Sequence, residues 1–293
     1  MSRHPYDPNK LENFYPGDRY ETQPRHVNIL ARLFTYATFY TRVYLGTALW
    51  LNRKAAKGQC DDLTWSYGSY WVREEAERVG MRFFIEGLDI INNLDGPVVF
   101  VGNHMSTMET FILPSVIRPR RPVTFVVKRS LTTMPGFGPI MRSRDPVVVD
   151  RVNPREDLKA ILEQGTERLA KGISIIVFPQ STRRRYIEAE HFNTIGVKLA
   201  RRAGVPVVPL ALKTDAWGSG RLVKEMGPLT VNHDVLFRFF PPLTIKGNGH
   251  AEHKAILETI SHTLRYWELR QDFIDIGKEP RPVIEPDFTP PYL

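Results

Sequence analysis

Two apolar runs, SIIVF at residues 174–178 and VPVVPLAL at residues 205–212, decide the fold class of this chain. Both runs are almost continuously apolar, which is typical of strands that are buried on both faces of a parallel sheet. The segment between them, residues 194–203, is a candidate helix. A strand, a helix and a second strand in this order indicate the β-α-β unit of a parallel sheet.

The same alternation extends outward from these runs over the chain from residue 82 onward. Strands are expected at Arg82–Ile85, Val98–Val101, Thr124–Val127, Val147–Val149, Ser174–Phe178, Val207–Leu212 and Val235–Phe239. Helices are expected at Thr107–Val116, Arg155–Lys171, Thr194–Ala203 and His253–Arg270. The sequence therefore predicts an α/β fold with a mixed, largely parallel central sheet flanked by helices, preceded by an N-terminal membrane-associating helical segment.

The ends of the chain differ in composition from its middle. Of the 23 prolines, four precede Val27 and five follow Lys278. Because proline-rich ends are usually poorly packed, we expect residues 1–26 and 276–293 to form extended tails. The remainder divides into a helical segment at residues 27–58 and one compact domain at residues 59–275.

The most apolar stretch is Val27–Arg53, which is rich in Tyr, Phe, Leu and Trp but is interrupted by Arg32 and Arg42. An arginine at the centre of a bilayer costs about 2.5 kcal/mol or more, which disfavours a spanning helix. A helix that lies in the interface with its aromatic rings at headgroup depth fits better. We therefore expect residues 27–58 to form an amphipathic, aromatic membrane anchor; the alternative is a helix packed on the protein's own core.

Composition and charge narrow the classes of function. The chain has 293 residues, 42% of them hydrophobic, which excludes chain-wide disorder. Its net charge of +8 would attract nucleic acid, an anionic membrane surface or phosphorylated substrates. The single cysteine, Cys60, allows neither an intramolecular disulfide nor a Cys-based metal site. Residues 1–10 lack an apolar segment, so a cleaved signal peptide is not expected.

Chemically active side chains follow four of the predicted strands. His104 and Glu109 come after the first of them, Lys128 and Arg151 after the next two, and Arg183 after the fourth. Ligands of open parallel sheets bind at the carboxyl ends of the strands. One histidine, one carboxylate and several cations should therefore gather at a single edge.

The five-residue spacing of His104 and Glu109 decides how they can meet. On one continuous helix they would point about 140° apart, but a histidine in the turn can reach a glutamate in the first helical turn. Such a pair forms a general base, because the carboxylate orients the imidazole and stabilises its cation. Alternatively, Glu109 closes a capping box with Ser106, a role compatible with the first, and His104 is a histidine merely hydrogen-bonded at a strand end.

No enzyme nucleophile stands out in the sequence. Cys60 is distant from the motif region, and no G-x-S-x-G elbow is present. His104 is therefore expected to deprotonate a substrate hydroxyl. The cations Lys128, Arg151 and Arg183 suit phosphate binding; a solvated basic face is the alternative, favoured for Arg184, Arg185, Arg201 and Arg202.

The sequence Asn103-His104-x4-Glu109 resembles the His-x4-Asp/Glu motif of the 1-acylglycerol-3-phosphate acyltransferase family, which acylates glycerolipids and lysophospholipids. Three later blocks resemble that family in the same order. They are Lys128 through Pro135 with Gly138 and Asp150-Arg151; Phe178-Pro179-Gln180-Ser181-Thr182-Arg183, usually F-P-E-G-T-R; and Val205-Pro206-Val207-Val208-Pro209. Together the blocks cover roughly 40% of the chain, about residues 95–215.

The resemblance implies an O-acyltransferase that moves a fatty acyl group from acyl-CoA or acyl-carrier protein to a lysophospholipid hydroxyl. The first expected acceptor is 1-acylglycerol-3-phosphate, giving phosphatidic acid. It implies no metal, no cofactor beyond the thioester co-substrate and no acyl-enzyme. His104 would deprotonate the acceptor and Glu109 would orient His104. The expected substrate-binding residues are Lys128, Arg151, Gln180, Ser181, Thr182 and Arg183.

The resemblance also implies a place in the cell and in the chain. Relatives carry an N-terminal helical anchor, so the protein is expected at the cytoplasmic face of a membrane, with residues 59–275 as the acyltransferase domain. Three residues depart from the usual pattern: Glu109 replaces Asp, Gln180 replaces Glu and Ser181 replaces Gly. Gln180 removes a negative charge beside the acceptor, which leaves open lysophosphatidate, another lysophospholipid or a non-glycerol lysolipid.

Two other functions compete with an acyltransferase. One is a non-catalytic basic module that binds lipid or nucleic acid and retains a vestigial motif. Because residues 183–185 lack the interleaved aromatic side chains of nucleic-acid binders, no nucleic-acid partner is expected. The other is a lipid hydrolase that uses water in place of the acceptor hydroxyl.

Overall fold

The computed structural model describes residues 14–293 and contains one eight-stranded sheet of order β1-β2-β8-β7-β3-β6-β4-β5. Neighbouring strands are parallel except for the pairs β1–β2 and β7–β8, which are antiparallel. The strands are β1 (Arg19–Glu21), β2 (Phe83–Glu86), β3 (Val99–Gly102), β4 (Val123–Lys128), β5 (Val147–Val149), β6 (Ser174–Val177), β7 (Val207–Lys213) and β8 (Val235–Phe239). This confirms the predicted mixed, largely parallel α/β sheet.

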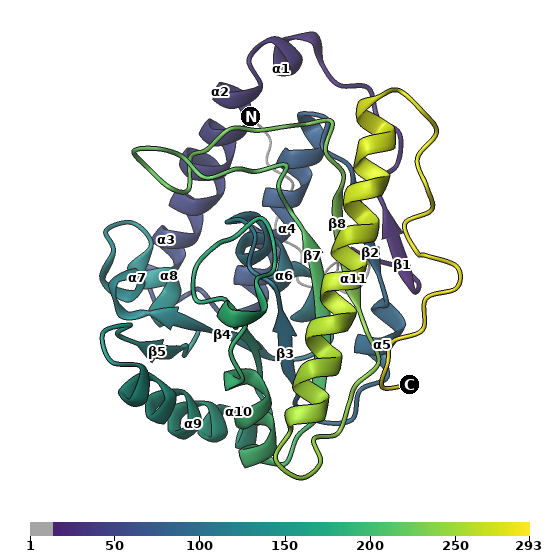
Figure 1. Ribbon diagram of the computed structural model, residues 1–293. Coiled ribbons are helices and arrows are strands. Elements are labelled where there is room, and N and C mark those ends of the chain that lie inside the picture. Colours follow the sequence, from purple (N-terminus) through teal and green to yellow (C-terminus); the bar gives the residue numbers. More distant parts are fainter. Residues whose placement is uncertain (1–13) are drawn as a thin grey trace.

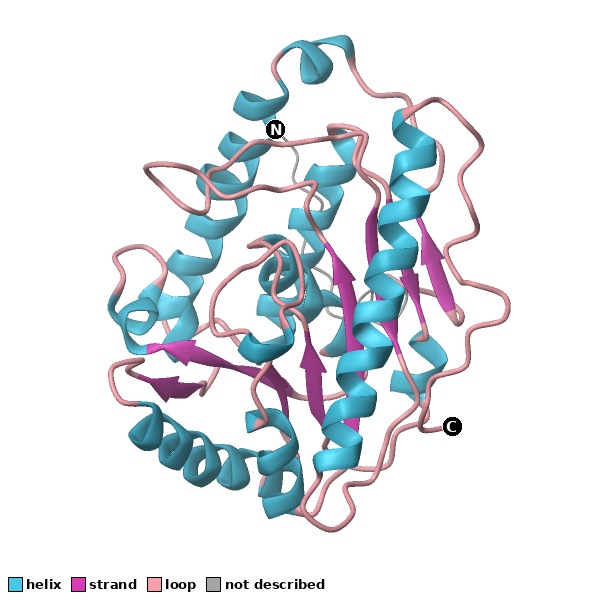
Figure 2. Ribbon diagram, viewed as in Figure 1, coloured by secondary structure: helices cyan, strands magenta, loops and turns pink. Residues whose placement is uncertain are grey.

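Helices cover both faces of the sheet (Figure 2). They are α4 (Asp62–Arg78), α5 (Leu88–Asn92), α6 (Met108–Ile117), α7 (Arg129–Thr133), α8 (Gly138–Arg142), α9 (Pro154–Ala170), α10 (Ile195–Ala203) and α11 (His250–Asp275). Side chains alternate between two cores along each strand. Phe100 joins the core beneath α4 and α6, whereas Val99 and Val101 join the core beneath α9, α10 and α11. The continuously apolar strands are thus buried on both sides.

All seven predicted strands and all four predicted helices are present, with ends shifted by a few residues. The helix α4 was not predicted. It begins at an N-cap, where the Asp61 carboxylate accepts the backbone N–H of Thr64 at 2.7 Å. It packs along α6, the helix that follows the His104 turn.

The segment predicted as a membrane anchor is helical. It consists of α1 (Ile29–Leu33), α2 (Thr35–Tyr40), the π-helix η2 (Thr41–Ala48) and α3 (Leu49–Ala56). One side packs on the domain through Phe39 and Val43, which are fully buried. None of the helices in residues 14–293 has the length and apolar character needed to cross a bilayer.

The two predicted tails require correction. Residues 1–13 lie outside the described part of the chain, but within residues 14–26 Tyr15 is buried and β1 adds a strand beside β2. Residues 276–293 form no helix or strand, yet they pack along α11, where the Trp267 indole donates to the Val283 carbonyl at 2.8 Å. Prolines in both segments limit regular structure, but they do not prevent packing.

Candidate active site

The turn that carries His104 is bound firmly to the neighbouring strand. After Gly102 ends β3, the Asn103 amide donates to the Leu212 carbonyl at 2.7 Å and accepts the Leu212 N–H at 2.8 Å. Gly102 lets the two strands approach, since a Cβ there would lie 3.0 Å from the Leu210 carbonyl oxygen. The backbone of His104 is therefore placed by β3 and β7 together.

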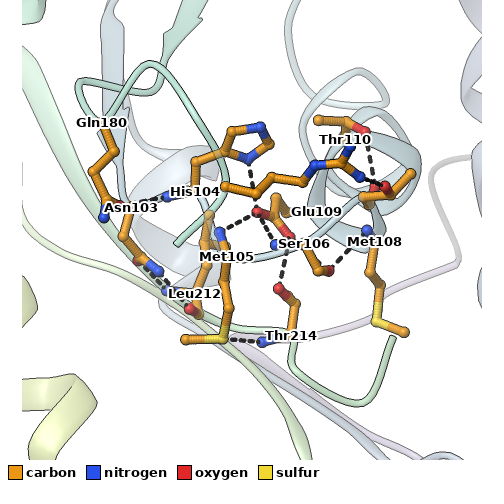
Figure 3. A network of polar contacts seen from close by, with 12 residues as sticks. Asn103, His104, Met105, Ser106, Met108, Glu109, Thr110, Gln180, Leu212 and Thr214 are labelled. Atoms are coloured by element: carbon orange, nitrogen blue, oxygen red, sulfur yellow. Dashed lines mark hydrogen bonds and ion pairs between the residues drawn. The ribbon is translucent and has the colours of Figure 1, made fainter. Parts of the chain in front are cut away.

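His104 and Glu109 meet as the spacing predicts. His104 lies in the turn, Glu109 lies in the first turn of α6, and the His104 Nδ1–Glu109 Oε1 distance is 2.9 Å (Figure 3). Because an ionised carboxylate can only accept, Nδ1 carries the proton and Nε2 presents a lone pair. The His104 side chain is 15% exposed and that of Glu109 is 0% exposed, so only the imidazole of the pair reaches solvent.

The Glu109 carboxylate is surrounded by donors, with the Thr214 hydroxyl on the side opposite His104 (Figure 3). Its Oε1 accepts the backbone N–H groups of Met105 at 2.6 Å and Ser106 at 2.8 Å, and its Oε2 accepts the Thr214 hydroxyl at 2.6 Å. Burial alone would raise the pKa of Glu109. The hydrogen bond and charge of His104, with the Thr214 and Ser106 bonds, outweigh burial and lower the pKa below its ordinary value. Glu109 is therefore ionised at neutral pH.

The capping role predicted for Glu109 coexists with the pairing. Glu109 accepts the Ser106 N–H, and the Ser106 hydroxyl accepts the Met108 N–H at 3.0 Å. These reciprocal bonds close the N-terminus of α6 in the manner of a capping box. One carboxylate thus both starts the helix and fixes the imidazole.

The loop that follows β6 holds His104 from its other side. The Gln180 Oε1 accepts the His104 N–H at 2.8 Å, and its Nε2 donates to the Tyr186 carbonyl at 3.0 Å. The His104 ring stacks on Phe178 with 4.5 Å between centroids. Gln180 is buried, and its side chain helps to position His104.

Arg183 is the predicted cation that lies beside the dyad. Its Nη1 donates to the hydroxyl of Thr107, the residue that precedes α6, and its Nη2 lies 3.1 Å from Glu225 Oε1. The Arg183 side chain is 18% exposed, so it borders both the dyad and solvent.

The other predicted binding residues lie around this centre. Arg151 donates to the Ser181 carbonyl and so supports the same loop, while Thr182 and Lys128 are exposed. Ser181 has a φ of +56°, a left-handed conformation that glycine adopts more readily. This explains why glycine is usual at that position of the resembled motif. The structure brings Gln180 and Arg183 to the dyad, but it leaves Lys128 at the solvent-facing end of β4.

Two residues of the site were missed in the sequence. Thr214 directly follows β7, so the rule that drew attention to the ends of the other strands would also have found it. Glu225 lies in a long loop with no motif, and no sequence signal indicated its pairing with Arg183. Within residues 14–293, no three His, Cys, Asp or Glu side chains cluster as a metal site would require.

An apolar cavity of about 30 Å³ adjoins the first turn of α6. Its wall includes Thr110 and Phe111, which follow Glu109, and side chains from η2, α3, α4 and α8. The first turn of α6 therefore borders apolar packing on this side.

Known proteins and a protein family are similar to this part of the chain. Residues 82–213 match the family described as Acyltransferase. A 1-acyl-sn-glycerol-3-phosphate acyltransferase from Pseudomonas aeruginosa is 34% identical over 147 residues, which are 50% of this chain and 54% of that protein. The enzyme of the same name from Escherichia coli is 29% identical over 119 residues, 41% of this chain and 48% of that protein.

A solved structure shares the fold. The 1-acyl-sn-glycerophosphate (LPA) acyltransferase from Thermotoga maritima has a TM-score of 0.61 and 19% sequence identity, covering 82% of this chain and 98% of that one. The chain spans about half the length of the curated relatives it matches. The likeness in sequence therefore centres on the strands and loops that build the dyad, and the likeness in fold extends over most of the chain.

Proposed function

We propose that this chain is a member of the acyltransferase family and that it moves a fatty acyl group from a thioester donor to the free hydroxyl of 1-acyl-sn-glycerol-3-phosphate. The observation that carries the proposal is the 2.9 Å contact between His104 Nδ1 and Glu109. It leaves the Nε2 lone pair directed away from the carboxylate, where a substrate hydroxyl can donate to it. The names of the relatives supply the acceptor and the kind of reaction.

The dyad can perform this transfer without a covalent enzyme intermediate. The acceptor hydroxyl gives its proton to His104 Nε2 while its oxygen attacks the thioester carbonyl. The buried Glu109 charge stabilises the imidazolium that forms. When the tetrahedral intermediate collapses, the carbon–sulfur bond breaks and the thiolate takes the proton from Nε2. Among the described residues no serine, threonine or cysteine side chain hydrogen-bonds to His104, so none is poised as the nucleophile.

Arg183 is the proposed ligand of the acceptor phosphate. It donates to the hydroxyl of Thr107, the residue that precedes α6, and a guanidinium binds phosphate through parallel hydrogen bonds. Lys128 and Arg151 would add positive charge at the same sheet edge, and the exposed Thr182 would border the headgroup. Ser181 would act through its backbone, which Arg151 supports. Gln180 would act indirectly, through His104.

Membrane contact is proposed for residues 27–58. On α1, α2 and the residue between them a set of large apolar side chains is exposed: Ile29, Leu30, Leu33, Phe34 and Tyr36. A row of this kind fits the headgroup region of a bilayer, which is also where a lysolipid acceptor resides. Because acyl-CoA and acyl-carrier protein are water-soluble donors, we place the protein at the cytoplasmic face and leave both donors as substrates to be tested.

The test is a transfer assay with purified protein, labelled acyl-CoA or acyl-carrier protein, and a panel of lysolipid acceptors. We expect labelled phosphatidic acid from 1-acyl-sn-glycerol-3-phosphate, and a loss of product in His104→Ala. Label released as free fatty acid without any acceptor would instead indicate a thioester hydrolase. Full transfer activity in a folded His104→Ala protein would refute the mechanism.

A further inference from the structure

A loop between β7 and β8 crosses from the sheet to the N-terminal helices (Figure 1). We call residues 218–228 the tip loop. The Tyr40 hydroxyl donates to its Gly227 carbonyl at 2.6 Å, and the Tyr44 hydroxyl donates to the Glu225 carbonyl at 3.0 Å. The Trp217 indole also donates to the Glu225 carbonyl, at 3.0 Å. The tip loop is therefore fastened to the helices proposed to lie on the membrane.

The tip loop has a defined shape. Its two arms are joined where the Gly218 N–H donates to the Pro228 carbonyl at 2.8 Å, and the turn closes where the Gly220 N–H donates to the Lys224 carbonyl at 3.1 Å. A Cβ on Gly227 would lie 2.0 Å from the Gly218 oxygen, so the arms approach too closely for any side chain there. The glycines thus allow the two arms to form a narrow hairpin.

The end of the tip loop is apolar, basic and exposed. Leu222 is 99% exposed, Val223 50% and Met226 47%. Arg221 and Lys224 are also exposed and flank the two aliphatic side chains. Apolar side chains placed among cations complement an anionic lipid surface, because the apolar groups enter the interface while the cations meet lipid phosphates. At the base of the tip loop, the Leu229 N–H donates to the hydroxyl of Tyr36, one of the exposed side chains of α2, at 3.0 Å.

One residue of the tip loop turns inward. Glu225 lies between the exposed side chains of Lys224 and Met226, and its Oε1 is 3.1 Å from Arg183 Nη2. The Glu225 carboxylate is therefore paired with the Arg183 guanidinium, which the acceptor phosphate would need. The Glu225 backbone stays fixed through Tyr44 and Trp217, so a rotation of its side chain alone would free Arg183.

We propose that the tip loop is a membrane-dependent gate, in which Leu222 and Val223 insert into an anionic lipid surface and a lipid phosphate displaces Glu225 from Arg183. A phosphate monoester carries about −1.5 to −2 charges at neutral pH and is a stronger partner for arginine than one carboxylate. Insertion brings the loop to the headgroup region, where a lipid with a phosphate monoester, such as lysophosphatidate, presents this group to Arg183, whereas in water Glu225 keeps Arg183 occupied. The identity of the displacing lipid as the acceptor rests on the proposed function; insertion and the competition for Arg183 do not.

Insertion can be measured without any enzyme activity. The native Cys60 is buried, so an environment-sensitive fluorophore would label Leu222→Cys selectively. We expect its emission to shift to the blue with phosphatidylglycerol vesicles but much less with neutral vesicles. The matched control is labelled Ala251→Cys, exposed in the first turn of α11 at the opposite end of the molecule (Figure 1), and it should not respond. No shift at position 222, or a shift with protein concentration alone, would overturn the membrane role.

The gate is tested by headgroup binding. Glu225→Gln keeps the shape of the side chain and removes its charge, so glycerol 3-phosphate should bind about 3- to 10-fold more tightly by calorimetry. The matched control is Glu188→Gln, which removes the partner of Arg184 in the neighbouring ion pair and should change nothing. Equal or weaker binding by Glu225→Gln would overturn the gate.

The two proposals can fail separately. If insertion and tighter headgroup binding are observed but no acyl transfer occurs, the gate stands and the proposed function falls. If acyl transfer occurs and neither effect is observed, the proposed function stands and the gate falls. As a further check, Leu222→Asp with Val223→Asp should lower transfer to an acceptor in anionic vesicles at least 10-fold, while transfer to a monomeric short-chain acceptor stays unchanged.

Discussion

Replacing Glu109 by glutamine separates the charge of this side chain from its shape. The structure dictates how the amide must lie. Oε1 faces the N–H groups of Met105 and Ser106 and the proton on His104, and such donors cannot become acceptors. Oε2 faces the hydroxyls of Thr214 and Ser106, which can rotate and accept, and it receives only the longer contact, at 3.1 Å, of the N–H that Ser106 shares with Oε1. The amide oxygen must therefore replace Oε1, which keeps the proton on His104 Nδ1 and the lone pair on Nε2.

The expected loss of activity follows from this orientation. In the serine proteases, replacing the carboxylate by an amide costs about 10⁴ in turnover because the histidine adopts the wrong tautomer. Here the tautomer is retained, so only the stabilisation of the imidazolium is lost. We expect a decrease of roughly 10² in turnover, at the lower end of what general-base catalysis contributes. The free energy of unfolding should fall by about 1–3 kcal/mol, because two hydroxyls lose a charged acceptor. The lower cost of burying a neutral amide offsets only part of this loss.

The assay is turnover at saturating donor and acceptor, combined with thermal melts. His104→Ala gives the baseline without a base, and Glu163→Gln, an exposed position on α9, controls for the substitution itself. Near-normal turnover in Glu109→Gln would leave Glu109 as a helix cap only. A loss near 10⁴ in a folded protein would show that the amide binds in the opposite orientation, contrary to the donor arrangement described above.

Four further expectations follow from the same contacts. Arg183→Ala should raise the acceptor KM about 10- to 100-fold and leave the thioester KM unchanged, because one charge-assisted contact contributes about 1.5–3 kcal/mol; the two KM values are measured separately. Thr214→Val should lower turnover about 10-fold with an unchanged acceptor KM, since Glu109 loses a buried donor but keeps its charge; Thr133→Val, exposed on α7, is the control. Ser181→Gly should raise the free energy of unfolding by about 0.5–1 kcal/mol in urea melts, because residue 181 has a positive φ. The folded-state pKa of Glu109 is lowered, so its stabilisation is complete above its ordinary pKa of 4.5 and is lost as pH falls through the folded value. The difference in unfolding free energy between the native chain and Glu109→Gln should therefore shrink below about pH 4.5, and a difference that grows in acid would contradict the assignment.

The sequence predicted those elements whose burial can be inferred from their own residues. Continuous apolar runs such as SIIVF and VPVVPLAL report burial on two faces, so the strands could be placed closely. The helix α4 escaped because its buried face contains Ser66, Gly68 and Ser69, small residues that an apolar pattern does not detect. Strand β1 escaped because it has only three residues and depends on distant partners, such as the Tyr20 hydroxyl donating to Glu77 on α4.

The site divides along similar lines. The sequence indicated His104 and Glu109 because the two residues lie in one turn and in the helix start that follows it, so their spacing could be judged directly. Glu225 reaches Arg183 from more than forty residues away in the chain and lies in a loop without a motif, so only the fold brings it there. Thr214 is as distant from Glu109 in the chain, but it directly follows β7, where the strand-end rule applies. Lys128 is exposed although it pairs with Val149 of β5, and a motif does not state whether a side chain is exposed.

Gln180 makes contacts in the structure that its place in the motif does not state. Its amide accepts the His104 N–H and donates to the Tyr186 carbonyl. A carboxylate could make the first bond but would present a lone pair to the second oxygen, and it would add a charge near the buried Glu109. Glutamine therefore satisfies both partners of this loop where glutamate would not. The departure at position 180 is explained by the support of His104, so discrimination between acceptors should depend on the surroundings of Arg183 instead.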